Sequence, residues 1–123
     1  MTLIVDDDPV FLQHAKAILN LDKGMFFAKN GREAISFIKF IDFSLAMVDL
    51  ELPGENGFDL IREIRVACPG LPIIAISGVY SRDVLESAKT FGAEEVLKKP
   101  ATAEWKPVVE RLRQKSLARR AGP

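Results

Sequence analysis

Five short, mostly apolar runs alternate along the chain with segments of helical periodicity, and this alternation constrains the fold more than any other feature. The runs lie at residues 3–5, 25–28, 45–48, 73–76 and 95–98. Strands that are separated by helices pair in parallel, and the helices then cover both faces of the sheet. The sequence therefore predicts a doubly wound α/β protein with a five-stranded parallel sheet and five helices.

Helix start and stop signals lie between these runs. Asp8 directly precedes a proline, and this pair is typical of a helix N-terminus. Asn30 is followed three residues later by Glu33, which is the pattern of a capping residue with a reciprocal acidic partner. Gly92 follows the helical pattern of residues 84–91 and predicts a C-cap there. These signals place helices in the segments between the strands.

The chain length suits one domain. With 123 residues it can bury a core without metal or disulfide cross-links. We expect a single domain over residues 1–123, with a core over about residues 2–113 and a last helix that begins near Trp105. Residues 114–123 are rich in arginine and lysine, and we expect them to form a basic helix end that frays.

Charge and composition argue against several classes of protein. The 17 basic residues balance the 17 acidic ones, which argues against nucleic acid or an anionic membrane surface as the main partner. Cys68 is the single cysteine, which rules out an internal disulfide and fits a reducing compartment. The N-terminus lacks the features of a signal peptide, and no apolar stretch is long enough to span a bilayer. We therefore expect a cytoplasmic protein.

Polar side chains follow four of the five predicted strands. In chain order these residues are Asp6 and Asp7, then Asp49, then Ser77 and Gly78, and finally Lys99. The carboxyl ends of parallel strands meet at one edge of a sheet, and ligand sites form outside that edge. The sequence therefore predicts that three acids, a hydroxyl and an amine lie close together.

These residue types suit phosphoryl chemistry. Three close carboxylates repel one another unless a cation lies between them. Mg²⁺ suits this set, because it is a hard cation that binds one or two carboxylates together with water and phosphate oxygens. A carboxylate such as Asp49 can attack a phosphoryl group to form an aspartyl phosphate. Lys99 and hydrogen-bond donors such as Ser77 and the Gly78 amide would then stabilise the transferred group.

Four short motifs lie at the ends of the predicted strands. They are IVDDD, VDLELPGENG with proline four and glycine eight residues after Asp49, IAISG, and KKP. Together they resemble the receiver domain of two-component response regulators over about residues 2–113. This resemblance implies a flavodoxin-like (βα)5 fold with strand order 2-1-3-4-5. The sequence contains no DNA-binding or enzymatic output domain, so we expect a stand-alone receiver.

The resemblance implies a role for each polar residue. It identifies Asp49 as the phosphoacceptor and Lys99 as the phosphate-binding lysine. The magnesium ligands would be Asp6, Asp7, Asp49 and the backbone carbonyl of Glu51. Ser77 would be the switch hydroxyl, and the Gly78 amide would donate a hydrogen bond to the phosphoryl group. The peptide bond between Lys99 and Pro100 is expected to be cis, which costs little before proline.

The resemblance also implies the partners. A histidine kinase or a histidine phosphotransfer protein would phosphorylate Asp49, and the resulting conformational change would be read by a downstream protein. That protein would contact the helix at residues 84–91, the strand at residues 95–98 and the last helix. The domain would not be an enzyme, although it would assist its own phosphorylation and dephosphorylation.

Two positions depart from the family pattern. Val96 and Ala101 stand where the family usually has aromatic residues. Val96 is short and stiff at χ1 and cannot replace a rotating aromatic switch. We therefore expect the signal to pass through residues 78–81 and the start of the next helix.

Two alternatives remain beside the phosphorylated receiver. The first is a pseudo-receiver, an interaction module that is never phosphorylated. The second is a phosphohydrolase that forms an aspartyl phosphate as an intermediate and uses Glu51 as its acid and base.

Overall fold

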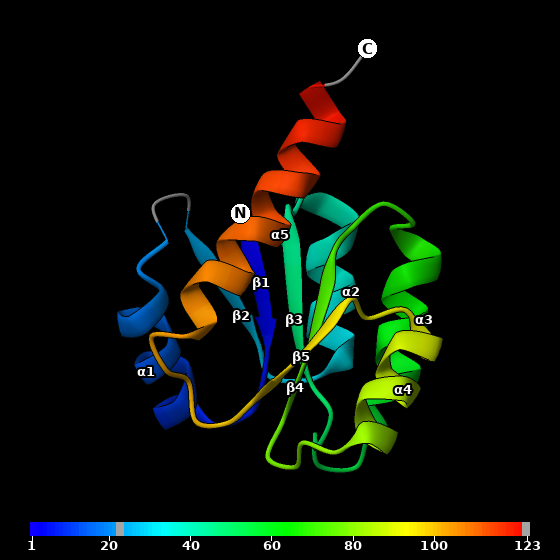
Figure 1. Cartoon of the computed structure of the whole chain (residues 1–123). Helices are drawn as coiled ribbons and strands as arrows, with labels where there is room; N and C mark the ends of the chain where they lie inside the picture. The colour runs from blue at the N-terminus through cyan, green and yellow to red at the C-terminus, as the bar shows by residue number, and fades with distance from the viewer. Residues whose placement is uncertain (22–23, 122–123) are drawn as a thin grey trace.

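The computed structural model of the chain describes residues 1–21 and 24–121 (Figure 1). Within these ranges one sheet contains β1 (Thr2–Val5), β2 (Met25–Ala28), β3 (Leu45–Asp49), β4 (Ile73–Ser77) and β5 (Glu95–Lys98). The strand order is β2-β1-β3-β4-β5, and each neighbouring pair is parallel. The predicted α/β class and the flavodoxin-like strand order are confirmed.

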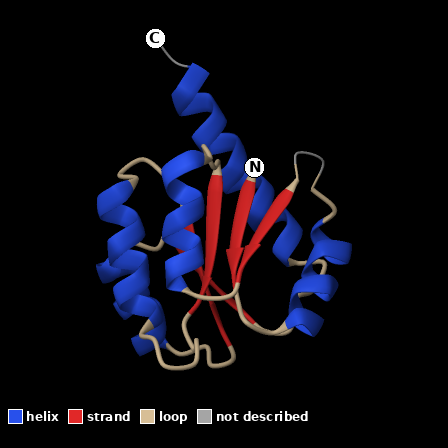
Figure 2. Ribbon diagram, turned by 180° about the vertical axis from the view of Figure 1, so that it is seen from behind, coloured by secondary structure: helices blue, strands red, loops and turns tan. Residues whose placement is uncertain are grey.

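Helices cover both faces of the sheet (Figure 2). In the described ranges they are α1 (Pro9–Leu19), α2 (Gly31–Phe40), α3 (Gly57–Ala67), α4 (Arg82–Phe91) and α5 (Trp105–Ala121). Leu3 and Val5 of β1 belong to the apolar cluster that includes residues of α2, α3 and α4, whereas Ile4 between them belongs to the cluster that includes residues of α1 and α5. Both faces of the central strands are therefore buried, which explains their continuous apolar runs. None of these helices is long and apolar enough to cross a membrane.

The predicted helix N-caps have the expected donors and acceptors. Asp8 Oδ1 accepts a hydrogen bond of 3.0 Å from Val10 N, and Asn30 Oδ1 accepts one of 2.9 Å from Glu33 N. The Glu33 carboxylate accepts a hydrogen bond of 2.7 Å from Lys29 N, the amide before the capping residue. The reciprocal contact at α2 therefore closes one residue earlier than a capping box would.

A tight turn follows β3. Pro53 and Gly54 lie at its centre, and a hydrogen bond of 3.2 Å from Glu55 N to Leu52 O closes it. Gly54 has a φ of +70°, a conformation that glycine adopts without steric cost. The proline four residues after Asp49 is therefore the first central residue of a turn between β3 and α3.

Gly57 is required for a different reason, a close approach of two backbone segments. A Cβ atom at this position would lie 2.5 Å from Leu50 Cα and 2.7 Å from Asp49 O. Only a residue without a side chain lets α3 begin this close to the end of β3. The glycine eight residues after Asp49 thus fixes the backbone that carries this aspartate.

Arg65 ties the C-terminal end of α3 to that of α4. Its Nη1 donates to Leu71 O and its Nη2 donates to Gly92 O, each at 2.6 Å. Gly92 is the C-cap of α4, as predicted, and has a φ of +125°. The guanidinium of Arg62 also lies 4.3 Å from the centroid of the Phe91 ring. These contacts hold the end of α4 against α3.

The last helix begins where the sequence predicts. Trp105 is its first residue, is buried, and lies 5.9 Å from Phe11 between ring centroids. Pro107 lies in the first turn, where its missing amide hydrogen would have no partner within the helix.

The same helix continues into the basic segment. We expected residues 114–123 to form a basic helix end and a frayed tail; α5 continues to Ala121, and residues 122–123 lie outside the described ranges. Ser116 is buried, and Lys115 forms an ion pair of 3.1 Å with Glu94. These contacts extend the ordered helix, whose final turns project past the sheet (Figures 1 and 2).

The close approach at Gly57 yields a stability prediction. Gly57→Ala should lower the free energy of unfolding by about 1–3 kcal/mol, because the added carbon overlaps backbone that cannot move freely. Gly70→Ala is the matched control, since no atom lies within 4 Å of a Cβ at that position. Urea unfolding measures both variants. Equal stability of the Gly57 and Gly70 variants would contradict this account.

Candidate functional site

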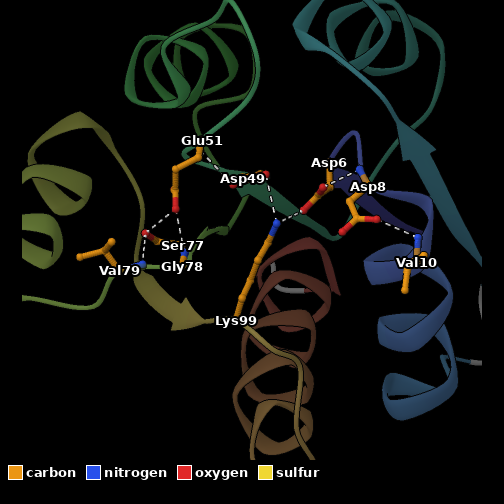
Figure 3. Close-up of polar contacts among 9 residues, drawn as sticks. All are labelled: Asp6, Asp8, Val10, Asp49, Glu51, Ser77, Gly78, Val79 and Lys99. Carbon is orange, nitrogen blue, oxygen red and sulfur yellow. Dashed lines mark hydrogen bonds and ion pairs between the residues drawn. The ribbon is translucent and has the colours of Figure 1, made fainter.

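The sheet register brings the predicted site residues to one edge. Val5 pairs with Val48, and Ser77 pairs with Lys98 on the neighbouring strand. The strands therefore end nearly level, and the residues at or just after these ends meet. Figure 3 shows the side chains of Asp6, Asp49 and Lys99 converging at this edge.

Three carboxylates form a compact cluster. One oxygen each of Asp6, Asp7 and Asp49 can be chosen so that all lie within 4.8 Å of one another. Asp6 and Asp49 are buried, whereas Asp7 is exposed. The Oδ1 atom of Asp6 accepts a hydrogen bond from Asp8 N, and Oδ1 of Asp49 accepts one from Glu51 N, each of 2.9 Å. Backbone amides thus orient the two buried acids.

Lys99 lies between the two buried acids. Its Nζ is 2.7 Å from Asp6 Oδ2 and 3.2 Å from Asp49 Oδ2. The contact with Asp6 has the length of an ion pair without hydrogen-bond geometry, so this buried oxygen has no hydrogen-bond partner. Nζ also lies 4.5 Å from the centroid of the Phe11 ring. The peptide bond from Lys99 to Pro100 is cis, as predicted.

The pKa values of this group reflect burial and charge. Burial raises the pKa of Asp6 above its ordinary value, although the contact with Lys99 and the hydrogen bond from Asp8 act in the opposite direction. Burial acts to lower the pKa of Lys99, but its contacts with Asp6 and Asp49 outweigh this effect and raise it. The ammonium therefore stays charged at neutral pH and partly neutralises the crowded acids.

The loop after β4 carries the predicted hydrogen-bond donors, and both already donate to the Glu51 side chain. Glu51 Oε1 accepts a hydrogen bond of 2.7 Å from Gly78 N and one of 3.2 Å from Ser77 Oγ. Val79 N donates to the same Ser77 Oγ at 3.0 Å. Figure 3 shows the Glu51 side chain reaching from the end of β3 to this loop.

Sequence reasoning missed this contact of Glu51. It gave the residue a role through its backbone carbonyl, or as the acid and base of a hydrolase. The signal that could have revealed the contact is an acidic side chain just beyond a strand, beside the donors that follow the next strand.

The residues fit a magnesium ion. The set offers hard carboxylate oxygens within 4.8 Å, from both buried and exposed side chains. The buried Asp6 Oδ2 faces the Lys99 ammonium but accepts no hydrogen bond, so it keeps a lone pair for a cation. Asp6, Asp7 and Asp49 could together hold such an ion.

The family model of the response regulator receiver domain matches residues 2–106. The chain belongs to this family. Receiver domains are generally regulatory phosphoacceptors and generally bind Mg²⁺ at an acidic aspartate cluster, which here corresponds to Asp6, Asp7 and Asp49.

Relatives of this receiver support the same assignment. The cell cycle transcriptional regulator CtrA of Caulobacter vibrioides is 32% identical over 101 residues, which cover 80% of this chain and 43% of that protein. The receiver thus spans less than half the length of the curated relatives it matches.

Two solved structures share the fold of this receiver. A CheY-like response regulator receiver domain protein from Methanospirillum hungatei superposes with a TM-score of 0.80 at 27% identity, covering 98% of this chain and 97% of that one. A response regulator protein from Burkholderia pseudomallei gives 0.79 at 26% identity, covering 98% and 70% respectively. The Burkholderia pseudomallei protein was crystallised with a phosphorylated aspartic acid, a calcium ion and citrate.

The positions that depart from the family pattern lie in packed surroundings. Val96 is buried in the apolar cluster on the face of the sheet that α2, α3 and α4 cover. Ala101 is buried on the opposite face, and its carbonyl oxygen accepts a hydrogen bond of 3.0 Å from His14 Nε2. His14 therefore has a backbone partner in the loop after β5.

The acidic cluster yields a prediction for metal binding. Mg²⁺ at about 100 times its dissociation constant should stabilise the wild-type domain by about 2.7 kcal/mol. Asp7→Asn should lose most of this gain and leave the metal-free fold intact, because Asp7 is exposed. Asp8→Asn is the matched control: it removes the same charge one residue later, and asparagine still caps α1. Thermal melts with and without Mg²⁺ measure the effect. A full Mg²⁺-dependent shift in the Asp7 variant would remove Asp7 from the site.

Proposed function

We propose that this receiver accepts a phosphoryl group on Asp49 from the phosphohistidine of a histidine kinase or a histidine phosphotransfer protein. One observation carries the proposal. The Asp49 carboxylate lies beside two further acids within 4.8 Å and beside a lysine ammonium at 3.2 Å. In this proposal Asp49 is the nucleophile, the neighbouring acids are the cation site and Lys99 is the positive side chain that phosphoryl transfer requires.

The proposed step is a direct phosphoryl transfer. A carboxylate oxygen of Asp49 forms a bond to phosphorus, the bond from phosphorus to the donor's histidine nitrogen breaks, and that nitrogen keeps the electron pair. The charge at Asp49 then changes from −1 to about −2. Lys99 lies 3.2 Å from Asp49 Oδ2, so its ammonium is close enough to offset this added charge. Ser77 Oγ and Gly78 N are the donors that the new phosphoryl oxygens would use.

Mg²⁺ has a defined place in this proposal. Asp6, Asp7 and Asp49 would hold the ion together with the backbone carbonyl of Glu51. When bound, it would supply positive charge to the phosphoryl oxygens. The phosphorylated aspartic acid named for the Burkholderia pseudomallei relative, whose structure also contains a calcium ion, supports an acceptor aspartate in this fold.

The signal would leave the site through the loop after β4. A phosphoryl group at Asp49 would draw Ser77 and Gly78 toward it and shift the start of α4. A downstream protein would then read the surface of α4, β5 and α5. The domain would assist its own phosphorylation and dephosphorylation without acting as an enzyme on other substrates, and the cytoplasmic location expected from the sequence belongs to the same proposal.

The phosphoacceptor is tested by intact-mass analysis. Wild-type protein with Mg²⁺ and a small acyl-phosphate donor should gain the mass of one phosphoryl group, and Asp49→Asn should gain none. Asp59→Asn, in the first turn of α3, is the control for loss of an acidic side chain and should behave as wild type. Equal phosphorylation of the Asp49 variant would reject the assignment. Absence of phosphorylation in every protein would favour the pseudo-receiver.

A second measurement tests the path of the signal. A switch from 1:99 to 99:1 needs about 5.5 kcal/mol of differential stabilisation, and one charge-assisted hydrogen bond contributes only about 1.5–3 kcal/mol. Several contacts of the loop must therefore change together. With Mg²⁺ and a beryllofluoride phosphoryl mimic, NMR shifts of residues 78–85 should respond in both wild type and Val96→Ala.

Two NMR results would contradict a signal path through residues 78–85. Loss of the loop response in Val96→Ala would show that β5 carries the signal. Strong shifts in β5 with almost none in residues 78–85 would show the same.

A further inference from the structure

The Glu51 side chain lies where the proposed function needs free hydrogen-bond donors. Its Oε1 accepts from Gly78 N at 2.7 Å and from Ser77 Oγ at 3.2 Å. An amide has a single hydrogen and a serine hydroxyl has a single hydrogen, so both donors are used in this contact. A phosphoryl group on Asp49 can reach these donors only after Glu51 leaves them.

The position of Glu51 is set by its own backbone. Glu51 N donates to Asp49 Oδ1 at 2.9 Å, which holds the residue beside the acceptor carboxylate. The side chain then crosses from the end of β3 to the loop after β4 (Figure 3). The contact therefore links the acceptor strand directly to the loop that would carry the signal.

The Glu51 carboxylate and a phosphoryl group on Asp49 cannot use the Ser77 and Gly78 donors at the same time, because both are negatively charged. A carboxylate carries −1 and a phosphoryl group on aspartate about −2, and both need the same donors. Among the described residues the edge already has four acids, Asp6, Asp7, Asp49 and Glu51, against the Lys99 ammonium. A phosphoryl group arriving beside an undisplaced Glu51 would meet a negative charge in place of hydrogen-bond donors.

We propose that the Glu51 carboxylate is an internal competitor of the phosphoryl group, bound to the Ser77 and Gly78 donors in the unphosphorylated receiver and displaced when Asp49 is phosphorylated. This inference rests on the proposed function of Asp49. It assigns Glu51 a regulatory role that slows phosphorylation and holds the loop after β4 close to the site before any phosphoryl group arrives.

The competition is tested by the rate of phosphorylation. With Mg²⁺ and a small acyl-phosphate donor, Glu51→Ala should be phosphorylated about tenfold faster than wild type, a factor that corresponds to about 1.4 kcal/mol. Glu51→Gln should give a smaller increase, because it removes the charge and keeps an acceptor oxygen.

Glu55 offers a matched control in the same loop. Its Oε1 also accepts from a glycine amide, Gly31 N, at 2.9 Å. Glu55→Ala therefore removes an equivalent contact that does not involve the site donors. Its phosphorylation rate should equal that of wild type.

A second readout tests the contact without any phosphoryl transfer. In the unphosphorylated protein the Gly78 amide proton should resonate downfield, because it donates to a carboxylate, and it should move upfield in Glu51→Ala but not in Glu55→Ala. An unmoved Gly78 resonance in Glu51→Ala would overturn the proposal. An unchanged or slower phosphorylation rate in that variant would also overturn it.

The two readouts separate this proposal from the proposed function. If no protein is phosphorylated but the Gly78 resonance moves, the phosphoacceptor function has failed, and competition fails with it although the contact is real. If wild type is phosphorylated on Asp49 and Glu51→Ala gains no rate, the function stands and the competition alone is rejected.

Discussion

The ion pairing of Lys99 with Asp6 and Asp49 is the interaction on which this end of the molecule depends. A parallel sheet brings the ends of its strands together, and here that places two buried carboxylates side by side. A buried charge without a partner destabilises a protein by several kcal/mol, so the ammonium at 2.7 Å from Asp6 and 3.2 Å from Asp49 allows the cluster to exist in the folded chain. The same electrostatics make the edge receptive to a further cation, because one lysine does not balance the nearby acids.

The backbone around Asp49 explains why proline and glycine follow it at their particular spacing. Pro53 and Gly54 form the turn, and Gly57 lets α3 start against the backbone of Asp49 itself. Both devices act on the position of the carboxylate rather than on its chemistry. The acceptor is therefore held by packing on one side and by the hydrogen bond from Glu51 N on the other. A rigid acceptor beside a movable side chain suits a site whose state changes when one group replaces another.

The α/β class and the residues that end the strands could be predicted from patterns local to each segment, whereas the strand order came from the resemblance to receiver domains. Apolar runs marked the strands, Asp8 and Asn30 marked helix starts, and Gly92 marked a helix end. Three features could not be predicted. The Glu51 side chain depends on a loop 26 residues away in sequence. The length of α5 depends on the burial of Ser116 and on the ion pair of Lys115 with Glu94, both tertiary contacts. The acceptor role of Glu33 toward Lys29 depends on how the chain enters α2.

The contacts of Arg65 have a mechanical consequence for α4. Because its guanidinium holds Gly92 O at 2.6 Å and also binds the loop before β4, the C-terminal end of this helix is fastened to α3. The N-terminal end follows the loop of Ser77 and Gly78, and its side-chain polar contacts are local ones, the Ser81 cap and the pair of Arg82 with Glu86. The 10 residues of α4 span about 15 Å, and the contact of Gly92 with Arg65 lies at its C-terminal end. A tilt of about 5° about that end would move the N-terminal end by about 1.3 Å. Such a tilt would leave the end held by Arg65 in place, and its largest displacement would occur at the N-terminal end, next to the loop that touches the site.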